Sequence, residues 1–187
     1  MIRHGRTGWN AERRIQGRTD VPLSPEGRAE QAARRIPAAF AQAPAYSSPL
    51  ARAVETARLL GLDPVTDARL TEMDFGDWEG RTHAELTAED ADGMARLEAR
   101  GINMRPPGGE TPREVQTRLV EFLRSKDGGD LIAVCHKGVI RAAFALALDW
   151  DMTADMPFRV RWNEGQLFRF DDGRLSLEQA NLSLSAA

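Results

Sequence analysis

Apolar residues recur along the chain at spacings that predict several helices, each with recognisable start and stop signals. The segment Ser24–Phe40 is expected to be a helix, because Ser24 can cap it, Pro25 suits the first helical position and Glu26 lies in the first turn. Three further helices are expected, in chain order: Ser48–Leu60, closed by Gly61; Thr111–Ser125, opened by the capping box Thr111-Pro112-x-Glu114; and Gly138–Leu148.

Short apolar segments between these helices predict strands. Ala45–Ser47 is one candidate, and Leu131–Cys135 is an uninterrupted apolar run of the kind found in strands buried on both faces. Near the C-terminus, Phe158–Arg161 and Gln166–Phe170 are expected to pair as a hairpin around residues 163–165, and Leu175–Glu178 is a candidate further strand. Strands that alternate with helices predict an α/β fold whose mostly parallel sheet is covered on both faces.

Length and charge narrow the class of protein. No repeat, low-complexity block or Gly/Ser linker divides the 187 residues, so one domain over residues 1–187 is expected. With 25 basic and 28 acidic residues the net charge is −3, which gives no strong general field for nucleic acid or anionic lipid. The sequence has no apolar run of membrane length and no signal-peptide core. We therefore expect a cytoplasmic protein with neither a nucleic-acid nor a membrane partner.

Candidate chemistry lies at the ends of two predicted strands. His4 follows the apolar start of the chain, and His136 follows the strand Leu131–Cys135. Parallel strands bring their carboxyl ends to one edge of a sheet, where ligands of such folds bind. Arginines are common in this chain, since only Lys126 and Lys137 are lysines, and they carry weight only where their neighbours constrain them.

Two arginines and a glutamate satisfy that condition. Arg3 adjoins His4, and Arg52 opens the helix after the second strand. Two guanidinium groups and two imidazoles around one point would suit a tetrahedral dianion such as phosphate. A neutral imidazole can attack phosphorus, and a carboxylic acid such as Glu72 can protonate the leaving alcohol.

The same residues occur in a series of ordered motifs. In chain order these are Arg3-His4-Gly5-Arg6-Thr7-x-Trp9-Asn10, Gln16-Gly17-x-x-Asp20-x-Pro22-Leu23-Ser24-x-x-Gly27, Ser47-Ser48-Pro49-Leu50-x-Arg52-Ala53-x-Glu55-Thr56-Ala57, Glu72-x-x-Phe75-Gly76-x-Trp78-Glu79-Gly80, Pro107-Gly108-Gly109-Glu110-Thr111 and Cys135-His136-Lys137-Gly138-Val139-Ile140-Arg141. Together they resemble the histidine phosphatase superfamily, the phosphoglycerate-mutase-like clan, over residues 1 to about 150.

This resemblance implies a fold and a set of roles. The fold is a three-layer, doubly wound α/β sheet, mostly parallel, with helices on both faces. The implied site comprises His4 as the phosphorylated nucleophile, Glu72 as general acid and later base, Arg3, Arg52 and His136 as the phosphate clamp, and Asn10 and Gln16 near the ligand. No metal and no organic cofactor is expected.

The chain between the acid motif and the Pro-Gly-Gly motif bears on the reaction. Phosphoglycerate mutases of this clan are usually longer there, whereas here a small variable cap at about residues 81–106 is expected. This favours a phosphomonoester hydrolase acting on a small phosphorylated metabolite. Mutase-type phosphoryl transfer, a phosphohistidine or phosphoserine protein phosphatase, and a non-catalytic binding module remain alternatives. Arg96, Arg100, Asn103, Met104 and Arg105 could flank the pocket, and His83 is expected to be a surface residue without a partner.

Neither the substrate nor the oligomeric state follows from the sequence. Sugar phosphates, phosphoglycerates, nucleotide-like esters and a cobalamin precursor such as ribazole phosphate all remain open, and so do a monomer and a homodimer. Two departures from the family stand out. Met1-Ile2 leaves almost no strand before Arg3, so either the first strand is truncated and tolerated or, as we expect, the natural start lies upstream. Lys137 stands where many members have glycine, either to favour an anionic substrate or only to solvate a helix start.

A rival chemistry uses the single cysteine. Cys135 and Arg141 match the bare Cys-x5-Arg spacing of cysteine-dependent phosphatases, between a strand and a helix. However, Ala142 stands where a hydroxyl is expected after the arginine, and a cysteine that ends an apolar strand is more simply a buried, inert thiol. The histidine mechanism is therefore preferred.

Overall fold

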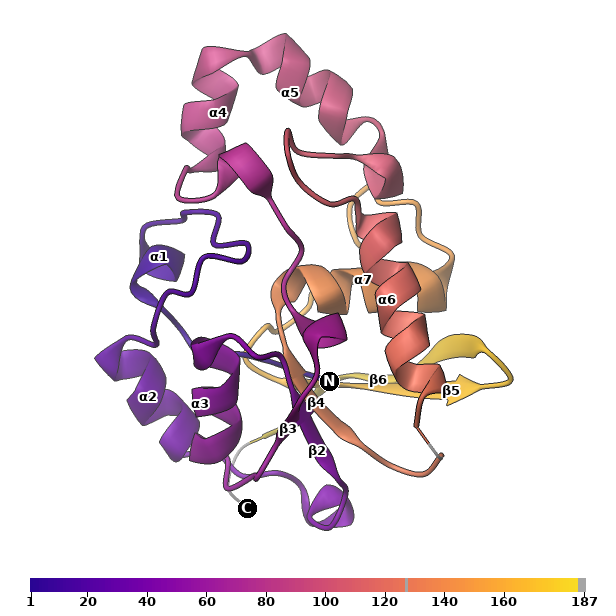
Figure 1. Cartoon of the computed structure of the whole chain (residues 1–187). Helices are drawn as coiled ribbons and strands as arrows, with labels where there is room; N and C mark the ends of the chain where they lie inside the picture. The colour runs from indigo at the N-terminus through magenta and orange to yellow at the C-terminus, as the bar shows by residue number, and fades with distance from the viewer. Residues whose placement is uncertain (127, 185–187) are drawn as a thin grey trace.

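The computed structural model describes residues 1–126 and 128–184, and its centre is a four-stranded parallel sheet (Figure 1). In the spatial order β1-β4-β2-β3, its strands are β1 (Ile2–Arg3), β4 (Ile132–Cys135), β2 (Ala45–Ser47) and β3 (Val65–Thr66). Arg3 lies opposite Cys135, and Ser47 lies opposite Val134. The carboxyl ends of β1, β2 and β4 therefore meet at one edge of the sheet.

Helices cover both faces of this sheet, as expected. On β4, Ala133 and Cys135 belong to one core cluster, together with residues of α6 (Pro112–Arg124) and α7 (Lys137–Leu148). Ile132 and Val134 belong to a second cluster, which includes residues of α3 (Ala51–Leu59). Successive side chains of a strand point to opposite faces, so a strand that is apolar throughout needs apolar partners on both sides. The result is a three-layer α/β fold.

The predicted helix starts are confirmed at Ser24 and Thr111. Ser24 caps α2 (Pro25–Ala32), and the capping box of Thr111 and Glu114 opens α6. The expected helix Ser24–Phe40 is wrong in its extent, because α2 ends at Ala32. Pro37 lacks a backbone N–H and disfavours helical geometry in the residue before it. The helix expected from Ser48 begins only at Ala51 and has Leu50 as its cap.

The expected C-terminal hairpin is wrong in its pairing. Residues 158–161 form no strand, and β5 (Gly165–Asp171) pairs instead with β6 (Arg174–Leu182) as a separate antiparallel sheet. The turn is Asp172-Gly173, with φ of 46° and 77°. Asp-Gly is a strong signal for a two-residue hairpin turn that requires positive φ at both positions. The candidate strand at 175–178 is confirmed as part of β6.

Smaller elements complete the described chain. These are α1 (Gly8–Ala11), α4 (His83–Glu89), α5 (Ala91–Glu98) and the short 3-10 turns η1 (Ala38–Phe40), η2 (Ala68–Leu70), η3 (Gly76–Trp78) and η4 (Gly101–Asn103). Helices α4 and α5 lie at the top of Figure 1, away from the sheet. Among residues 1–126 and 128–184, no helix has the length and apolar character needed to cross a membrane.

Candidate active site

The two predicted histidines meet at the carboxyl edge of the sheet. His4 follows β1 and donates its backbone N–H to the carbonyl of Cys135 at 2.9 Å, while His136 follows β4 and caps α7. Their ring centroids are 5.1 Å apart. Residues 132 positions apart in sequence thus lie in contact because β1 and β4 are neighbouring parallel strands.

The His4 ring is held in one tautomer. Its Nδ1 lies 2.7 Å from the carbonyl oxygen of Gly5. A carbonyl can only accept, so Nδ1 carries the proton and donates it, and the neutral ring keeps its lone pair on Nε2. Burial, followed by the charges of Arg3 and Arg52, holds the pKa of His4 well below its usual range. His4 is therefore a neutral imidazole at pH 7, the form that can act as a nucleophile.

His136 and Arg52 are fully buried, and unlike Arg3, His4 and Glu72 they do not belong to the pocket lining. Arg52 donates from its two terminal nitrogens to the carbonyls of Thr19 and Gly17, both at 2.7 Å. Its Nε and both ring nitrogens of His136 have no hydrogen-bond partner within residues 1–126 and 128–184. Burial lowers the pKa of His136 well below its usual range. Buried polar atoms usually have a partner, so these nitrogens are available to an oxygen of a ligand or of water that enters beside His4.

Arg3 and Glu72 contribute opposite charges to the same pocket, and both line it. Glu72 follows η2 and accepts hydrogen bonds from the backbone N–H groups of Met73 at 2.8 Å and Gly138 at 3.1 Å. Its pKa is raised by burial, against these hydrogen bonds and the charges of Arg52 and Arg3. A raised pKa keeps a carboxyl protonated at higher pH, which a general acid requires.

Gly138 is required for this contact. A Cβ at position 138 would lie 2.4 Å from Oε1 of Glu72, closer than any real contact. The glycine after Lys137 thus lets the first turn of α7 approach the carboxylate. The motif around His136 therefore places both the imidazole and a backbone donor to Glu72.

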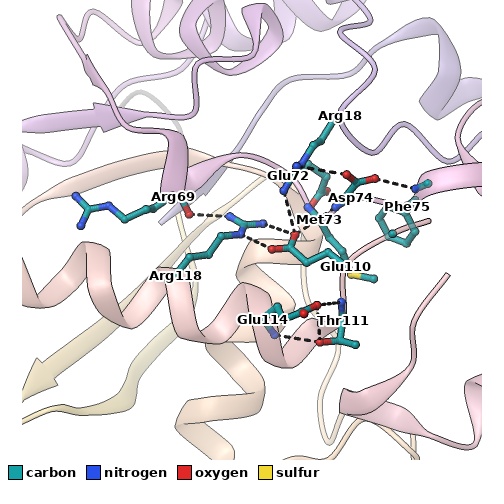
Figure 2. Close-up of polar contacts among 12 residues, drawn as sticks. Arg18, Arg69, Glu72, Met73, Asp74, Phe75, Glu110, Thr111, Glu114 and Arg118 are labelled. Atoms are coloured by element: carbon teal, nitrogen blue, oxygen red, sulfur yellow. Dashed lines mark hydrogen bonds and ion pairs between the residues drawn. The ribbon is translucent and has the colours of Figure 1, made fainter. Parts of the chain in front are cut away.

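A partly buried ion pair, which the sequence analysis missed, holds the segment that carries Glu72 (Figure 2). Arg118 of α6 pairs with Glu110 through two hydrogen bonds of 2.9 and 3.0 Å, and donates to the carbonyl of Arg69 at 2.7 Å. Glu110 in turn accepts from the backbone N–H of Asp74 and donates its own N–H to the Asp74 carbonyl. The pair thereby fixes the chain on both sides of Glu72. The Pro-Gly-Gly-Glu motif was the available signal.

Asn10 and Gln16 also line the pocket, as expected. The side-chain oxygen of Asn10 accepts from the backbone N–H of Thr7 at 3.0 Å, which closes a capping box on α1. Gln16 is 9% exposed, and its Oε1 has no partner in the described part of the chain. The amide groups of both side chains thus belong to the same pocket as His4 and Arg3.

The pocket that these residues line has a volume of about 870 Å³. Of the five cap residues expected to flank it, only Met104 lines it. The side chains of Asn103 and Arg105 are bound instead to Arg113 and Glu114.

His83 is exposed, but the expectation that it lacks a partner is wrong. Its Nε2 lies 2.7 Å from Glu98, and both residues line the pocket.

Cys135 lies outside the pocket lining and is fully buried. Burial raises the pKa of its thiol to about 12, so the thiolate that a cysteine-dependent phosphatase needs is absent at neutral pH. The rival assignment therefore fails on chemistry as well as on position. In residues 1–126 and 128–184, no three His, Cys, Asp or Glu side chains are grouped so that they could hold a metal ion.

The chain is similar to proteins that are named as mutases or phosphatases of phosphate esters. It is 33% identical to 2,3-bisphosphoglycerate-dependent phosphoglycerate mutase 2 of Gloeobacter violaceus, over 76% of this chain and 71% of the relative. A mycobacterial glucosyl-3-phosphoglycerate phosphatase, solved with VO3, superimposes with a TM-score of 0.78 and 29% identity over 98% of each chain. A phosphoglycerate mutase of Thermus thermophilus gives a TM-score of 0.64 and 35% identity, over 78% of this chain and 81% of that one.

A family model also matches the chain. The model of the histidine phosphatase superfamily (branch 1) covers residues 1–183, nearly the whole chain. The expected family and fold are confirmed by these matches. The chain belongs to the histidine phosphatase superfamily.

Proposed function

We propose that this protein is a phosphomonoester hydrolase that works through phospho-His4 on a small phosphorylated metabolite. The observation that carries the proposal is the state of His4. Its ring is neutral, its Nδ1–H is committed to the Gly5 carbonyl, and it lies in a pocket lined by Arg3 and Glu72. A nucleophile with a free lone pair thus faces groups suited to a phosphoryl dianion and to its leaving group.

In the first step, Nε2 of His4 forms a bond to phosphorus while the bond from phosphorus to the ester oxygen breaks. Protonated Glu72 gives its proton to that oxygen, so an alcohol leaves and Glu72 becomes a carboxylate. Arg3, Arg52 and His136 stabilise the charge on the three equatorial oxygens of the transferring group. The charges of Arg3 and Arg52 both act on His4, Glu72 and His136, whereas His136 is neutral and contributes through the hydrogen-bonding capacity of its ring nitrogens.

In the second step, the Glu72 carboxylate takes a proton from water, and the water oxygen attacks phosphorus. The bond between phosphorus and Nε2 breaks, inorganic phosphate leaves, and both His4 and Glu72 return to their starting states. No proton or electron is left over, and no cofactor takes part in either step.

The experiment is hydrolysis of p-nitrophenyl phosphate in the presence of EDTA by wild type, His4→Ala and Cys135→Ala. Turnover that survives EDTA and Cys135→Ala but is lost in His4→Ala supports the proposal. Vanadate should inhibit competitively, because it mimics the transferring group. Loss of turnover in Cys135→Ala with retention of the native fold would contradict the histidine mechanism.

Mutase-type transfer is the second candidate, and the named relatives favour it. Both the Gloeobacter relative and the Thermus structure are phosphoglycerate mutases. A mutase returns the phosphoryl group to the substrate instead of to water. Incubation with 3-phosphoglycerate and catalytic 2,3-bisphosphoglycerate distinguishes the two: a mutase yields 2-phosphoglycerate, and a hydrolase yields inorganic phosphate.

A further inference from the structure

The outer part of the pocket carries two cations that the proposed mechanism does not use. Lys137 and Arg141 both line the pocket. They are four residues apart on α7 (Lys137–Leu148), so they lie on the same face of that helix. The chain as a whole has a net charge of −3, so this basic wall does not reflect its overall composition.

Both cations are supported by aromatic rings and not by carboxylates. Nζ of Lys137 lies 5.3 Å from the centroid of the Trp162 ring, and Cζ of Arg141 lies 5.0 Å from that of Trp150. Within residues 1–126 and 128–184, neither side chain has a hydrogen-bond partner or a carboxylate oxygen within 4.0 Å, and these ring contacts are the direct interactions that the structure gives them. A cation held against a ring is fixed in place by the cation–π attraction while its N–H donors stay free.

One carboxylate acts on each of the two cations. Lys137 is exposed to solvent, yet desolvation, followed by the charges of Arg3 and Arg141, lowers its pKa, with only Glu72 acting in the opposite direction. Burial also lowers the pKa of Arg141, which only Asp155 counteracts. An anion bound between these side chains would relieve the unfavourable charge and supply the missing hydrogen-bond acceptors.

The position of Lys137 and Arg141 relative to the phosphate-binding residues sets how far from the ester phosphate a second anion can lie. Lys137 directly follows His136, whereas Arg141 is one turn further along α7, about 6 Å in rise. Lys137 interacts electrostatically with Arg3 and Glu72, which are the groups proposed to contact the ester. The pair therefore lies in the same pocket as Arg3 and Glu72, within two turns of His136 along α7, where the organic body of a substrate could reach it.

The pocket is large and apolar enough for such a body. Its volume of about 870 Å³ lies near the upper end of the range for small-molecule sites. Six of the apolar side chains that line it are Met73, Phe75, Met94, Met104, Met152 and Met156. Methionine side chains are flexible and adapt to ligands of irregular shape. A phosphate group alone would leave most of this surface uncovered.

We propose that Lys137 and Arg141 form a second anion subsite, and that the substrate is a phosphomonoester whose apolar or mixed body carries a further anionic group. The inference rests on the proposed function for the identity of the first group, which is the ester phosphate. A carboxylate and a second phosphate share the chemistry that these two cations recognise, and the probes below separate them.

The test compares matched esters with and without the second charge. The probes are 4-carboxyphenyl phosphate and its neutral analogue 4-carbamoylphenyl phosphate, with 1,4-phenylene bisphosphate as the second-phosphate arm. A flexible pair, 5-(phosphonooxy)pentanoate and its amide, covers a different reach. The readout is the ratio of kcat/KM for the charged and neutral members, so that any general effect on the chemical step cancels.

The variants are Lys137→Gln and Arg141→Gln, with Lys137→Arg as the conservative rescue. Arg58→Gln is the matched control, because Arg58 is an exposed cation of α3 outside the pocket lining. In wild type we expect at least one charged probe to exceed its neutral partner by about ten-fold, the size of a charge-assisted contact. That ratio should fall towards one in both Gln variants and persist in Lys137→Arg and Arg58→Gln.

Other outcomes would overturn the subsite. A wild-type ratio near one for every pair would do so, and so would a preference that both Gln variants retain. An equal loss for charged and neutral esters in Lys137→Gln would assign Lys137 to the ester phosphate instead. Calorimetric binding of 4-carboxyphenylphosphonate and 4-carbamoylphenylphosphonate to His4→Ala gives the same comparison without turnover. A charge preference in binding without any hydrolysis by wild type would support the subsite and contradict the proposed function.

Discussion

The floor of the pocket and its outer wall are built on different principles. The floor, formed by Arg3, His4 and Glu72 with Arg52 and His136 fully buried outside the pocket lining, lies at strand ends and helix starts. Hydrogen bonds from the backbone or to it hold His4, Arg52 and Glu72 in place. The outer wall, formed by α4, α5 and residues 150–156, is made largely of flexible and partly exposed side chains.

This difference separates the residues that carry out the reaction from those that select the substrate. Catalytic groups need fixed positions, because small displacements are costly in the transition state, and strand ends and helix starts supply them. A wall that is only lightly tied to the sheet can vary without disturbing that geometry. The contrast predicts that substitutions in the floor change rate constants, whereas those in the wall change stability or substrate choice.

The largest expected effect is that of His4→Ala. It removes the proposed nucleophile and should lower kcat for p-nitrophenyl phosphate by about 10⁴-fold or more. The fold should persist, because among the described residues the side chain makes a single hydrogen bond, to the adjacent Gly5 carbonyl. Steady-state kinetics measure the loss, and thermal unfolding is the control. Residual activity above about 1% of wild type, which is a loss of only about 10²-fold, would show that another group attacks phosphorus.

Glu72→Gln should have the next largest effect, about 10²- to 10⁴-fold for poor leaving groups. The loss should be smaller for p-nitrophenol, which leaves with little protonation. The side chain accepts from Met73 and Gly138, so thermal unfolding must show that the variant keeps its fold. Equal losses across a series of leaving groups would contradict the role of Glu72 as the acid.

The pH profile tests the same pair of groups. His4 must be unprotonated, and its pKa is held well below 6.5, so kcat/KM should rise with pH on a limb below 6.5. Glu72 must be protonated, and its pKa is raised above 4.5, so kcat/KM should fall with pH on a limb above 4.5. The alkaline limb should disappear in Glu72→Gln. A limb that persists there belongs to a different group.

Arg118→Ala tests how the floor is held. Arg118 and Glu110 are 14% and 13% exposed, and removing one partner of such a pair leaves the other charge unpaired. We expect a loss of about 3 kcal/mol in the free energy of unfolding and a fall in kcat for poor leaving groups that exceeds the fall for p-nitrophenyl phosphate. Arg118→Lys should restore part of both. Lost stability with unchanged leaving-group dependence would show that the pair does not position Glu72.

Leu86→Ala is the corresponding test in the wall. Leu86 is 5% exposed, packs in the small cluster with Trp78 and Met94, and does not line the pocket. Truncation should lower the free energy of unfolding by about 2 kcal/mol through the cavity it leaves. We expect kcat for p-nitrophenyl phosphate to change by less than about three-fold. A loss as large as that in Glu72→Gln would mean that the wall takes part in the chemical step.

The smallest effect is expected at the link between α4 and α5. His83 and Glu98 are 62% and 53% exposed, and exposed pairs contribute little. His83→Gln should therefore shift the melting temperature by less than about 2 °C. A larger shift, measured by thermal unfolding, would show that the outer wall is more firmly held than its exposure indicates.

The sequence predicted the elements whose signals are local. The cap at Ser24, the capping box at Thr111 and the apolar strand before His136 all depend on neighbouring residues, and each was found. The extent of α2 and the pairing of β5 with β6 were missed. In both cases the relevant local signal is in the sequence: Pro37 disfavours a helix that continues to Phe40, and Asp172-Gly173 forms the turn that pairs β5 with β6.

The sequence by itself thus determined the family, the order of the elements and the residue types at the floor of the pocket, because these depend on motifs and local backbone preferences. Only the tertiary structure decided which distant groups meet. The proton position on His4, the raised pKa of Glu72, the Arg118–Glu110 pair beside it and the presence of Lys137 and Arg141 of α7 in the same pocket all arise from packing. Burial and the approach of distant charges set these properties, and neither is encoded by residues adjacent in sequence.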